Sequence, residues 1–413
     1  MQTHVIAGAG QAGAHAAIAL RRAGFAGRIV LIGEEMVAPY DRPPLSKAYL
    51  TSSDATPLVY HFPPETFARE EIELVTGIRV EGINPKQGRV HLATGGTIDY
   101  DRVIIATGST ARKLDVPGAE SAFVLRSFGD ALRIRELLGH PRRVVCIGAG
   151  VIGLEVASAA IARGSAVTVV ERVSTVMSRS LHPEIAAHVE ALHRRAGVEF
   201  LFGTGVERIE GTGVILSNGA RLEADAVLLG IGIERNLALA TGAGLKVDRG
   251  VLVNASGETS VAGVYAAGEV AEYYSERLGC NVLQEAWQHA QDHGAFVGRN
   301  AAGIRDTYDP VPWFWSDQYG VNIQVAGHVS DAGRIVLRGD PASGEFSIFC
   351  LGRDDRISGA VGFNAGRDVS AAQRMMRSGV RVEPGELSDS RLNLRSLINS
   401  APRTSSVGAS PQG

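Results

Sequence analysis

The sequence contains little cysteine, and its cysteines lie far apart. Cys146, Cys280 and Cys350 are the only three in 413 residues, and none forms a CxxC or CxxxxC spacing. This excludes an enzyme that relays electrons through a cysteine pair. It also excludes an iron–sulfur cluster held by this chain, because no set of cysteine ligands is present. Cys146 stands inside the apolar strand VVCI, where a packed thiol is expected.

Long apolar runs and strong net charge are also absent. No apolar run approaches the roughly 18 residues that a membrane span requires. The chain starts directly with a strand-like segment, THVIA at residues 3–7, so we expect no targeting segment and a cytoplasmic location. The formal net charge of −3 indicates neither nucleic-acid binding nor attraction to an anionic membrane. Lysine is scarce as well, and Lys47 is one of only four.

Glycine is abundant, and its placement indicates an internal duplication. A short strand ends in GAGQAG at residues 8–13, an alanine-rich helix follows, and a second strand ends next to Glu34. The same order returns with GAGVIG at residues 148–153 and a second strand that ends at Glu171. Each half continues with short alternating strands and closes with an apolar strand followed by glycine. This repeat predicts two α/β domains that bind dinucleotides.

Each glycine motif has the context that dinucleotide binding requires: a strand before it, a helix after it, and an acid about twenty residues later. The first glycine permits a tight turn, the second lets backbone N–H groups approach a pyrophosphate, and the third packs the helix on the sheet. Glu34 and Glu171 are placed to accept hydrogen bonds from ribose hydroxyls. A carboxylate also repels a 2′-phosphate, so Glu171 favours NADH over NADPH, and the adjacent Arg172 acts weakly against this preference.

The glycines alone leave the two nucleotides open. Two nicotinamide nucleotides would fit, and so would one flavin and one nicotinamide. A flavin beside a nicotinamide has direct chemistry, because hydride moves to the flavin and the flavin can then release electrons singly.

Three further segments resemble a known family. PYDRPPLSK at residues 39–47, GVIGLE at 150–155 and PWFWSDQY at 312–319 together resemble the ferredoxin reductases of bacterial aromatic-ring dioxygenase and cytochrome P450 systems. The match runs in order over about residues 3–400, and the last octapeptide is its most specific part. The resemblance implies that the first fingerprint holds FAD, that the second holds NADH, and that the C-terminal domain shields the flavin.

The predicted fold is therefore α/β, with two Rossmann-like dinucleotide-binding domains of the glutathione-reductase-like flavoprotein type and a C-terminal α+β domain. Short alternating segments after residue 312 indicate that the C-terminal domain contains an antiparallel sheet. The predicted domains are 1–110 with 237–310 for FAD, 111–236 for NADH and 311–400 for the C-terminal domain, followed by a disordered tail at 401–413.

The resemblance implies two sets of binding residues and no metal. The FAD set is Gly8, Gly10, Ala12, Gly13, Glu34, Arg42, Lys47, Val80, Thr107, Gly108, Arg126, Glu269, Trp287 and Trp315. The NADH set is Gly148, Gly150, Val151, Ile152, Gly153, Glu155, Glu171, Gly230, Ile231 and Gly232.

Two positions depart from the family pattern. The family has Gly-Asp after the strand that ends at Ala267, and the aspartate bonds the flavin ribitol, whereas this chain has Glu269. Glutamate is one methylene longer, so the bond would need a water molecule or a shifted backbone. Arg235 stands where the family commonly has proline, which affects the rigidity of that loop.

The resemblance assigns the chemistry to Lys47 and Glu155. Lys47 would lie near flavin N5 and pair with Glu155, and a cation there would stabilise negative charge on the reduced flavin. Hydride transfer needs no general acid or base, so the protein contributes geometry, electrostatics and the exclusion of water. The alternatives are that Lys47 is a solvated loop lysine and that Glu155 is an ordinary acid near a helix start.

Trp315 and a histidine pair each have two interpretations. Trp315 is either a core aromatic or a flavin contact on the electron exit route. His289 and His293 have the i, i+4 spacing that can bind metal, but no third ligand is evident. We therefore expect these two histidines to lie on a solvated helix face.

We predict an NADH:ferredoxin oxidoreductase that passes hydride from NADH to FAD and single electrons to a [2Fe–2S] ferredoxin of the Rieske or P450 type. This ferredoxin would feed a ring-hydroxylating oxygenase or a P450. The PWFWSDQ segment favours this function over an NADH:rubredoxin reductase or a nitrite-reductase-like oxidoreductase. A non-catalytic NADH sensor of the apoptosis-inducing-factor type shares the fold, but its targeting segments and insertions are not evident. The sequence is compatible with a monomer and with a homodimer.

Overall fold

The computed structural model describes residues 1–52 and 57–400, so the predicted disordered tail lies outside the described residues. The chain forms two compact units, which are described separately. The first comprises Met1–Met177 and Ala187–Phe314, and the second comprises Ser178–Ala186 and the chain from Trp315 onward. No helix in the described chain is long and apolar enough to cross a membrane.

The first unit contains two five-stranded parallel sheets. In one sheet the central strand β1 (Thr3–Ala7) lies between β2 (Arg28–Ile32) and β7 (Arg102–Ile105). The outer strands are β3 (Ile72–Val75) next to β2 and β19 (Val264–Ala266) next to β7. Valine and isoleucine fill the inner strands and are buried, as is typical of a parallel sheet covered on both faces.

The second sheet has the same arrangement around its central strand, except that one outer strand comes from before the central strand in the chain and not from after it. Its central strand β10 (Arg143–Ile147) lies between β11 (Ala166–Glu171) and β16 (Ala226–Leu229). The outer strands are β12 (Glu199–Phe202) next to β11 and β9 (Phe123–Val124) next to β16. The predicted duplication and the α/β fold class are confirmed.

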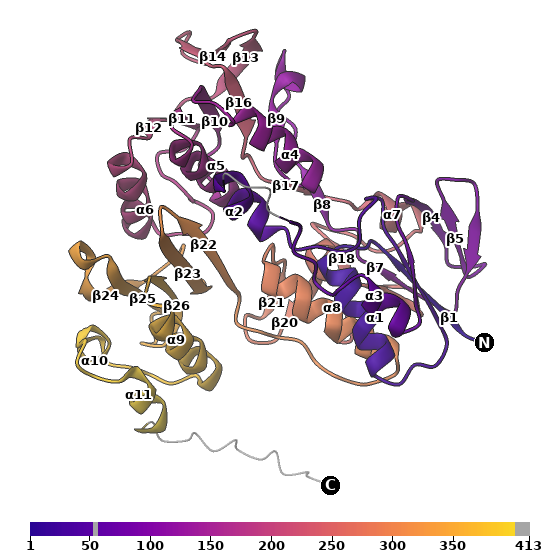
Figure 1. Ribbon diagram of the computed structural model, residues 1–413. Coiled ribbons are helices and arrows are strands. Elements are labelled where there is room, and N and C mark those ends of the chain that lie inside the picture. Colours follow the sequence, from indigo (N-terminus) through magenta and orange to yellow (C-terminus); the bar gives the residue numbers. More distant parts are fainter. Residues whose placement is uncertain (53–56, 401–413) are drawn as a thin grey trace. The chain divides into compact units, whose positions relative to one another are not determined.

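Helices begin directly after the central strands and cover the sheets. α1 (Gln11–Arg22) follows β1, and α5 (Val151–Ala162) follows β10. α8 (Trp287–Ala301) returns from far along the chain and packs along α1, as Figure 1 shows. The two helices approach closely because a Cβ atom on Gly294 would lie only 2.3 Å from the carbonyl oxygen of Ala12.

Smaller elements complete the first unit. Each half carries an antiparallel three-stranded sheet, and a two-stranded antiparallel ribbon joins β8 to β17. These strands are β4 (Val80–Asn84), β5 (Arg89–Leu92), β6 (Thr97–Asp99), β13 (Val206–Glu210), β14 (Gly213–Leu216), β15 (Arg221–Glu223), β8 (Ser109–Ala111) and β17 (Ile233–Arg235). The remaining elements are β18 (Val251–Val253), β20 (Ala271–Ser275), β21 (Cys280–Val282), α2 (Ala48–Thr51), α3 (Glu65–Arg69), α4 (Phe128–Leu137) and α7 (Ala238–Gly242), while α6 (Pro183–Arg195) is shared between the units.

The second unit is built on an antiparallel sheet with the strand order β22-β23-β26-β25-β24. The helix α9 (Gly366–Ser378) packs on this sheet, and Phe349, Ala360 and Met375 are buried together in the core. A sheet with helices on one face is the predicted α+β class. Its elements are β22 (Trp313–Gln318), β23 (Val321–Gly327), β24 (Arg334–Asp340), β25 (Glu345–Leu351), β26 (Ile357–Phe363), α9 (Gly366–Ser378), α10 (Pro384–Ser388) and α11 (Leu394–Ser400).

Candidate functional site

The two glycine loops have matching local geometry. Gly8 and Gly148 have positive φ angles of 117° and 98°. A Cβ atom on either would lie within 2.6 Å of a backbone carbonyl oxygen. Gly13 and Gly153 approach the carbonyl of the first glycine in their own loops, where a Cβ atom would lie 1.8 Å and 2.2 Å from the oxygen. Any side chain at these four positions would force the turn or the helix to move.

The middle glycines leave space in front of the helix starts. A Cβ atom on Gly10 would meet no atom within 4 Å, and one on Gly150 would meet only a carbonyl oxygen at 3.5 Å. α1 and α5 begin immediately after these residues. Open backbone before a helix N-terminus fits a pyrophosphate, so the residues present suit a bound dinucleotide at each loop.

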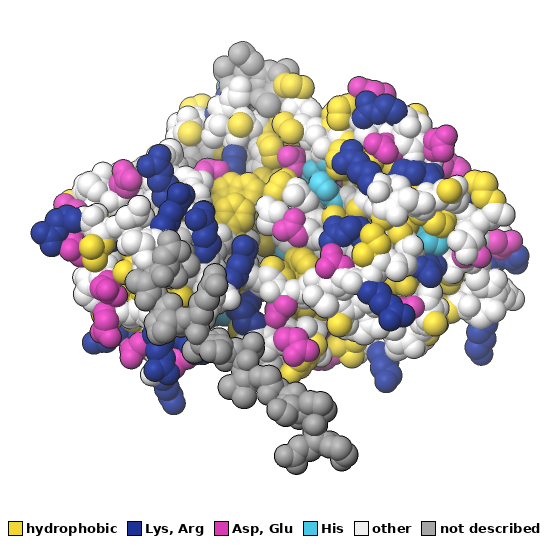
Figure 2. All heavy atoms as spheres, turned by 90° about the horizontal axis from the view of Figure 1, so that it is seen from below, with side chains coloured by type: hydrophobic (Ala, Val, Ile, Leu, Met, Phe, Trp, Pro, Cys, Tyr) yellow, Lys and Arg dark blue, Asp and Glu magenta, His cyan; other side chains and the backbone are white. Residues whose placement is uncertain are grey.

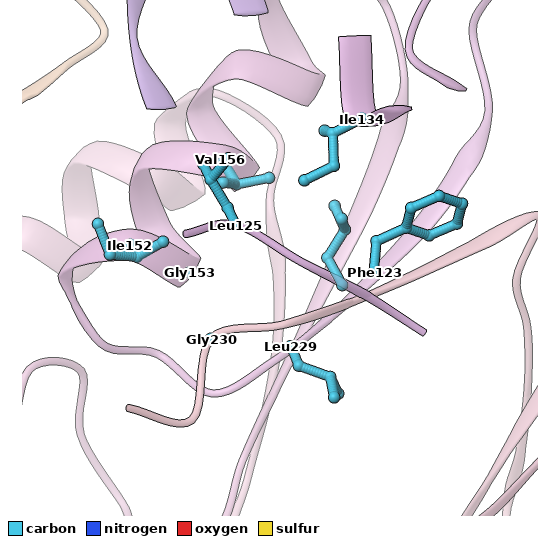
Figure 3. Close-up of a pocket in the computed structure, with 9 residues that line it drawn as sticks. Phe123, Leu125, Ile134, Ile152, Gly153, Val156, Leu229 and Gly230 are labelled. Atoms are coloured by element: carbon cyan, nitrogen blue, oxygen red, sulfur yellow. The ribbon is translucent and has the colours of Figure 1, made fainter. Parts of the chain in front are cut away.

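A small apolar pocket lies behind the second loop (Figure 3). Ile152 and Gly153 contribute from the first turn of α5, Gly230 from the facing loop, and Phe123 and Ile134 from the opposite side. Its volume of about 10 Å³ is close to that of a single water molecule. The pocket is therefore packing space beneath the loop and is too small for a nicotinamide ring.

The acids at the ends of β2 and β11 have different surroundings. Glu34 has a side chain that is 67% exposed and lies 3.5 Å from the Nε of Arg79. Glu171 accepts the backbone N–H groups of Ala149 at 2.8 Å and Val173 at 3.1 Å. Each carboxylate oxygen can accept a second hydrogen bond, so both acids retain capacity for ribose hydroxyls. Their nucleotide preferences stay predictions.

Lys47 and Glu155 form an ion pair. Lys47 Nζ lies 2.8 Å and 2.9 Å from the two carboxylate oxygens of Glu155. Their side chains are only 17% and 1% exposed, so neither is a solvated surface group. Ser46 Oγ donates a further hydrogen bond to the same carboxylate. These contacts offset the cost of removing the Glu155 charge from water.

The pair joins the two nucleotide-binding halves of the first unit. Lys47 follows a 3₁₀ turn at Pro43–Ser46, which two prolines favour by fixing φ, and it caps the short helix α2. Glu155 lies early in α5, two residues after Gly153 of the second glycine loop. The cation thus comes from the half with the first loop, and the carboxylate from the helix that the second loop opens.

Arg42 and Arg126 belong to one hydrogen-bonded network. Arg42 Nη1 donates to the carbonyl oxygen of Arg126 at 2.6 Å, and its Nη2 pairs with Glu35 at 2.8 Å. The hydroxyl of Tyr40 donates to Glu35 at 2.6 Å and accepts the N–H of Phe128 at 2.8 Å. Two predicted FAD residues are thereby fixed to each other across the start of α4.

Glu269 is bound by Arg126 and by Ser109. Arg126 Nη2 pairs with Glu269 Oε1, and Ser109 Oγ donates to the same oxygen at 2.9 Å. Burial would raise the pKa of this carboxyl, but the charge of Arg126 and the two hydrogen bonds outweigh burial, so the pKa is lowered. Oε1 also lies 3.1 Å from where a Cβ atom on Gly108 would stand, so the longer side chain folds over that glycine.

Arg235, at the position where the family commonly has proline, anchors its loop by hydrogen bonds. Its Nε donates to the carbonyl oxygen of Glu269 at 2.9 Å, and its Nη2 pairs with Glu285 at 2.6 Å. The next residue, Asn236, donates from Nδ2 to the carbonyl oxygen of Thr107 at 2.8 Å. The loop is therefore held without the restricted φ of a proline.

Trp287 is the first residue of α8, and its indole Nε1 donates to Asp41 at 2.8 Å. Asp41 also lies 3.0 Å from Nδ1 of His61. Burial would raise the pKa of Asp41, but the hydrogen bonds from His61 and Trp287 outweigh burial and lower the pKa.

His289 and His293 are buried, and the prediction of a solvated helix face was wrong. They are 2% and 1% exposed, and they pack against the rings of Tyr273 and Tyr308. His293 Nδ1 accepts the N–H of Gly268 at 3.1 Å. Burial lowers the pKa of His289 to about 4 and lowers that of His293 well below its ordinary value. The described residues contain no group of three or more side chains suited to a metal ion.

The remaining predicted residues are spread over several elements. Val80 begins β4 and packs against an apolar cluster. Gly232 has a φ of 104°, and its carbonyl accepts the N–H of Arg112 at 3.0 Å. Trp315 belongs to the second unit, where its Nε1 donates to Asp317 at 3.1 Å. Its contact with a flavin stays a prediction.

Several polar residues of these networks were not predicted from the sequence, among them Asp41, Ser46 and Ser109. Asp41 and Ser46 stand in the PYDRPPLSK segment, and their position beside Arg42 and Lys47 was the available signal. Ser109 had no signal except that it follows Gly108.

Two parallel nucleotide-binding sheets, each with a glycine loop at a helix start, define the class of oxidoreductases that bind two dinucleotides. The chain belongs to the pyridine nucleotide-disulphide oxidoreductase family, whose sequence model matches residues 2–294. A Reductase C-terminal domain matches residues 313–398.

The disulfide in that family name has no counterpart in this chain. All three cysteines are free, and Cys146 and Cys350 are buried. Burial raises the pKa of each of these two thiols to about 12, so neither forms a thiolate readily.

Curated relatives and solved structures cover nearly the whole chain. The anthranilate 1,2-dioxygenase system ferredoxin–NAD(+) reductase component of Burkholderia cepacia is 38% identical over 95% of this chain and 98% of its own length. The ferredoxin reductase for the CYP199A2 system from Rhodopseudomonas palustris is 35% identical, with a TM-score of 0.93 over 96% of this chain and all of that one. The reductase in a covalent putidaredoxin reductase–putidaredoxin complex also has a TM-score of 0.93 and 35% identity, over 97% of this chain and 99% of that one.

Proposed function

We propose that this protein is an FAD-dependent NADH:ferredoxin reductase that supplies electrons to a [2Fe–2S] ferredoxin. The observation that carries the proposal is the Lys47–Glu155 ion pair, which joins the half with the first glycine loop to the helix of the second. A charge fixed between two dinucleotide sites suits a reaction in which a flavin and a nicotinamide meet. The full-length similarity to ferredoxin reductases of dioxygenase and P450 systems supports the same function.

In this function some residues of the chain bind the two nucleotides, and others stabilise the charge that develops during the reaction. The backbone N–H groups at the starts of α1 and α5 receive the two pyrophosphates, and Glu171 selects NADH. A bound FAD would supply an acceptor for the hydride of NADH that can give up the two electrons singly, with release of one proton. Lys47 supplies positive charge where negative charge develops, and Glu155 and Ser46 hold that charge in a largely water-free position.

The partner is a one-electron carrier, because the proposed reaction delivers the two electrons of NADH singly. On the face in Figure 2, basic and acidic side chains are interspersed, so charge of one sign does not mark a docking area there. We propose a ferredoxin of the Rieske or P450 type that serves a ring-hydroxylating oxygenase or a P450. We also place the reaction in the cytoplasm, where NADH is available.

Anaerobic titration with NADH and a panel of [2Fe–2S] ferredoxins tests this function. The FAD-loaded protein should bleach on addition of NADH, and its absorption should return as a ferredoxin becomes reduced. A rubredoxin serves as the matched acceptor control. Retention of the oxidised flavin spectrum with NADH would refute the proposal, and reduction of rubredoxin alone would replace the ferredoxin with a different partner.

A further inference from the structure

Arg163 ties the segment that follows Lys47 to helix α5. It is the C-cap of α5 and stands eight residues after Glu155. Its Nε donates to the carbonyl oxygen of Leu50 at 2.9 Å, and its Nη2 donates to that of Ser52 at 2.8 Å. Leu50 lies in α2, and Ser52 is the C-cap of α2. One guanidinium therefore holds the far end of the helix that Lys47 begins.

Helix α5 thus holds the segment from residue 46 to residue 52 at two points. Glu155 binds Ser46 and Lys47 at one end, and Arg163 binds the carbonyls of Leu50 and Ser52 at the other. Eight residues of helix separate these two points by about 12 Å along the axis. A single ion pair fixes a distance, whereas two separated attachments also fix the direction of the segment.

Movement at the end of α2 reaches Lys47 directly because α2 has only four residues. The N–H groups of Leu50 and Thr51 both donate to the carbonyl oxygen of Lys47 at 3.0 Å. Leu50 is fully buried, and the Tyr49 ring packs 5.3 Å from that of Phe128. The short helix is therefore a rigid link between Arg163 and the backbone of Lys47.

We propose that Arg163 is a positioning residue that sets the orientation of Lys47 for electron transfer. The proposal rests on the proposed function, since it assumes that Lys47 takes part in flavin reduction. A guanidinium presents donors on separate nitrogens in a fixed plane and reaches two carbonyl oxygens at once, which a lysine ammonium cannot do with the same geometry. Arg163 acts through Lys47, and its effect should disappear when Lys47 is removed.

A double-mutant cycle on the FAD-loaded full chain tests this dependence. Rapid mixing with NADH measures the rate constant of flavin reduction in the wild type, Arg163→Ala, Lys47→Ala and the double variant. Arg163→Ala should slow reduction about tenfold in the wild-type background and less than about twofold in the Lys47→Ala background. The matched control is Arg142→Ala, because Arg142 Nε donates in the same way to the carbonyl oxygen of Leu137 at the end of α4, at 2.8 Å. The control variant should reduce at the wild-type rate.

Hydrogen exchange of the FAD-free full chain gives a second readout that does not depend on activity. The amides of residues 50–52 should exchange faster in Arg163→Ala than in wild type, with partial protection restored by Arg163→Lys and no change in Arg142→Ala. Equal slowing by Arg163→Ala in both backgrounds, or no slowing at all, would overturn the positioning role. Unchanged exchange would overturn the tie itself. A Lys47→Ala rate equal to wild type would instead overturn the role of Lys47 in the proposed function, and the role of Arg163 with it.

Discussion

Arg126 and Glu269 form an ion pair across 143 residues of sequence. The pair ties the segment after β9 to the turn that follows β19. In the family that the sequence resembles, an aspartate at this position bonds the flavin ribitol. In this chain the longer carboxylate of Glu269 is bound by an arginine and a serine. The Glu269 carboxylate is therefore bound by protein groups from two other segments of the chain.

The Arg126–Glu269 pair should contribute stability that depends on pH. The pKa of Glu269 is lowered in the folded chain, so its contribution is present above the ordinary value of 4.5 and is lost as pH falls below it. Glu269→Gln should lower the free energy of unfolding of the FAD-free protein by about 2 kcal/mol at pH 7, because Arg126 loses its partner. Urea unfolding at pH 7 and at pH 4 measures the difference, which should shrink at pH 4. Exposed Glu276→Gln is the control, and an equal difference at both pH values would contradict the prediction.

The buried residues His289 and His293 should lower the stability of the folded protein as the pH falls from 7 to 5. Both have lowered pKa values in the folded chain, so the unfolded chain binds more protons as pH falls below about 6.5 and is favoured. His293→Gln keeps an acceptor for the N–H of Gly268 and removes one titrating group. This variant should lose less stability than wild type between pH 7 and pH 5, by about 1.4 kcal/mol per pH unit below 6.5. Urea unfolding across this range tests it, with exposed His140→Gln as control. Parallel curves for wild type and His293→Gln would rule out the effect.

Removal of the Lys47 charge should slow flavin reduction without loss of FAD. Lys47→Ala deletes the cation beside Glu155, and one lost electrostatic contact of this kind costs about 100-fold in rate. Lys47→Arg retains the charge and should retain part of the rate. Rapid mixing with NADH gives the rate constant, and flavin fluorescence of the filtrate reports retention. Exposed Lys246→Ala should behave as wild type, and a Lys47→Ala rate within twofold of wild type would reject the assignment.

Glu171 should set the choice between NADH and NADPH. Its carboxylate holds the loop through Ala149 and Val173 and repels a 2′-phosphate. The wild type should reduce much faster with NADH, and Glu171→Gln should lower the NADH-to-NADPH ratio of kcat/KM about tenfold. Glu207→Gln, at an exposed position of β13, is the control. Similar kcat/KM values for both nucleotides in the wild type would exclude this role.

The fold could be predicted because its signals are local and repeated. Strand, glycine turn, helix and strand-end acid follow one another twice, and four of the five strands have the same order in the two sheets, around β1 and β10. The glycines at the first and third positions were predictable for the same reason, since a Cβ atom there would clash with backbone.

The contacts around the site were less predictable because they join residues distant in sequence. Lys47 and Glu155 were paired through the family resemblance, while Arg163 and Ser109 gave no signal of their partners. The histidines were misassigned for a related reason. An i, i+4 polar pair indicates one helix face, but only the packing of Tyr273 and Tyr308 against that face shows that it is buried.

The hydrogen bonds from Ala149 and Val173 to Glu171 have a consequence for turnover. In the proposed assignment this loop binds the nicotinamide nucleotide. Its own chain already orders it, so each binding event carries no further entropic cost for ordering the loop. A co-substrate binds and dissociates in every catalytic cycle. A pre-organised loop suits such a co-substrate, because neither step requires the loop to change between an ordered and a disordered state. Among the described residues, the Glu34 carboxylate pairs with Arg79 and accepts no hydrogen bond from the backbone of the first loop, which suits the proposed FAD, a prosthetic group that stays in place.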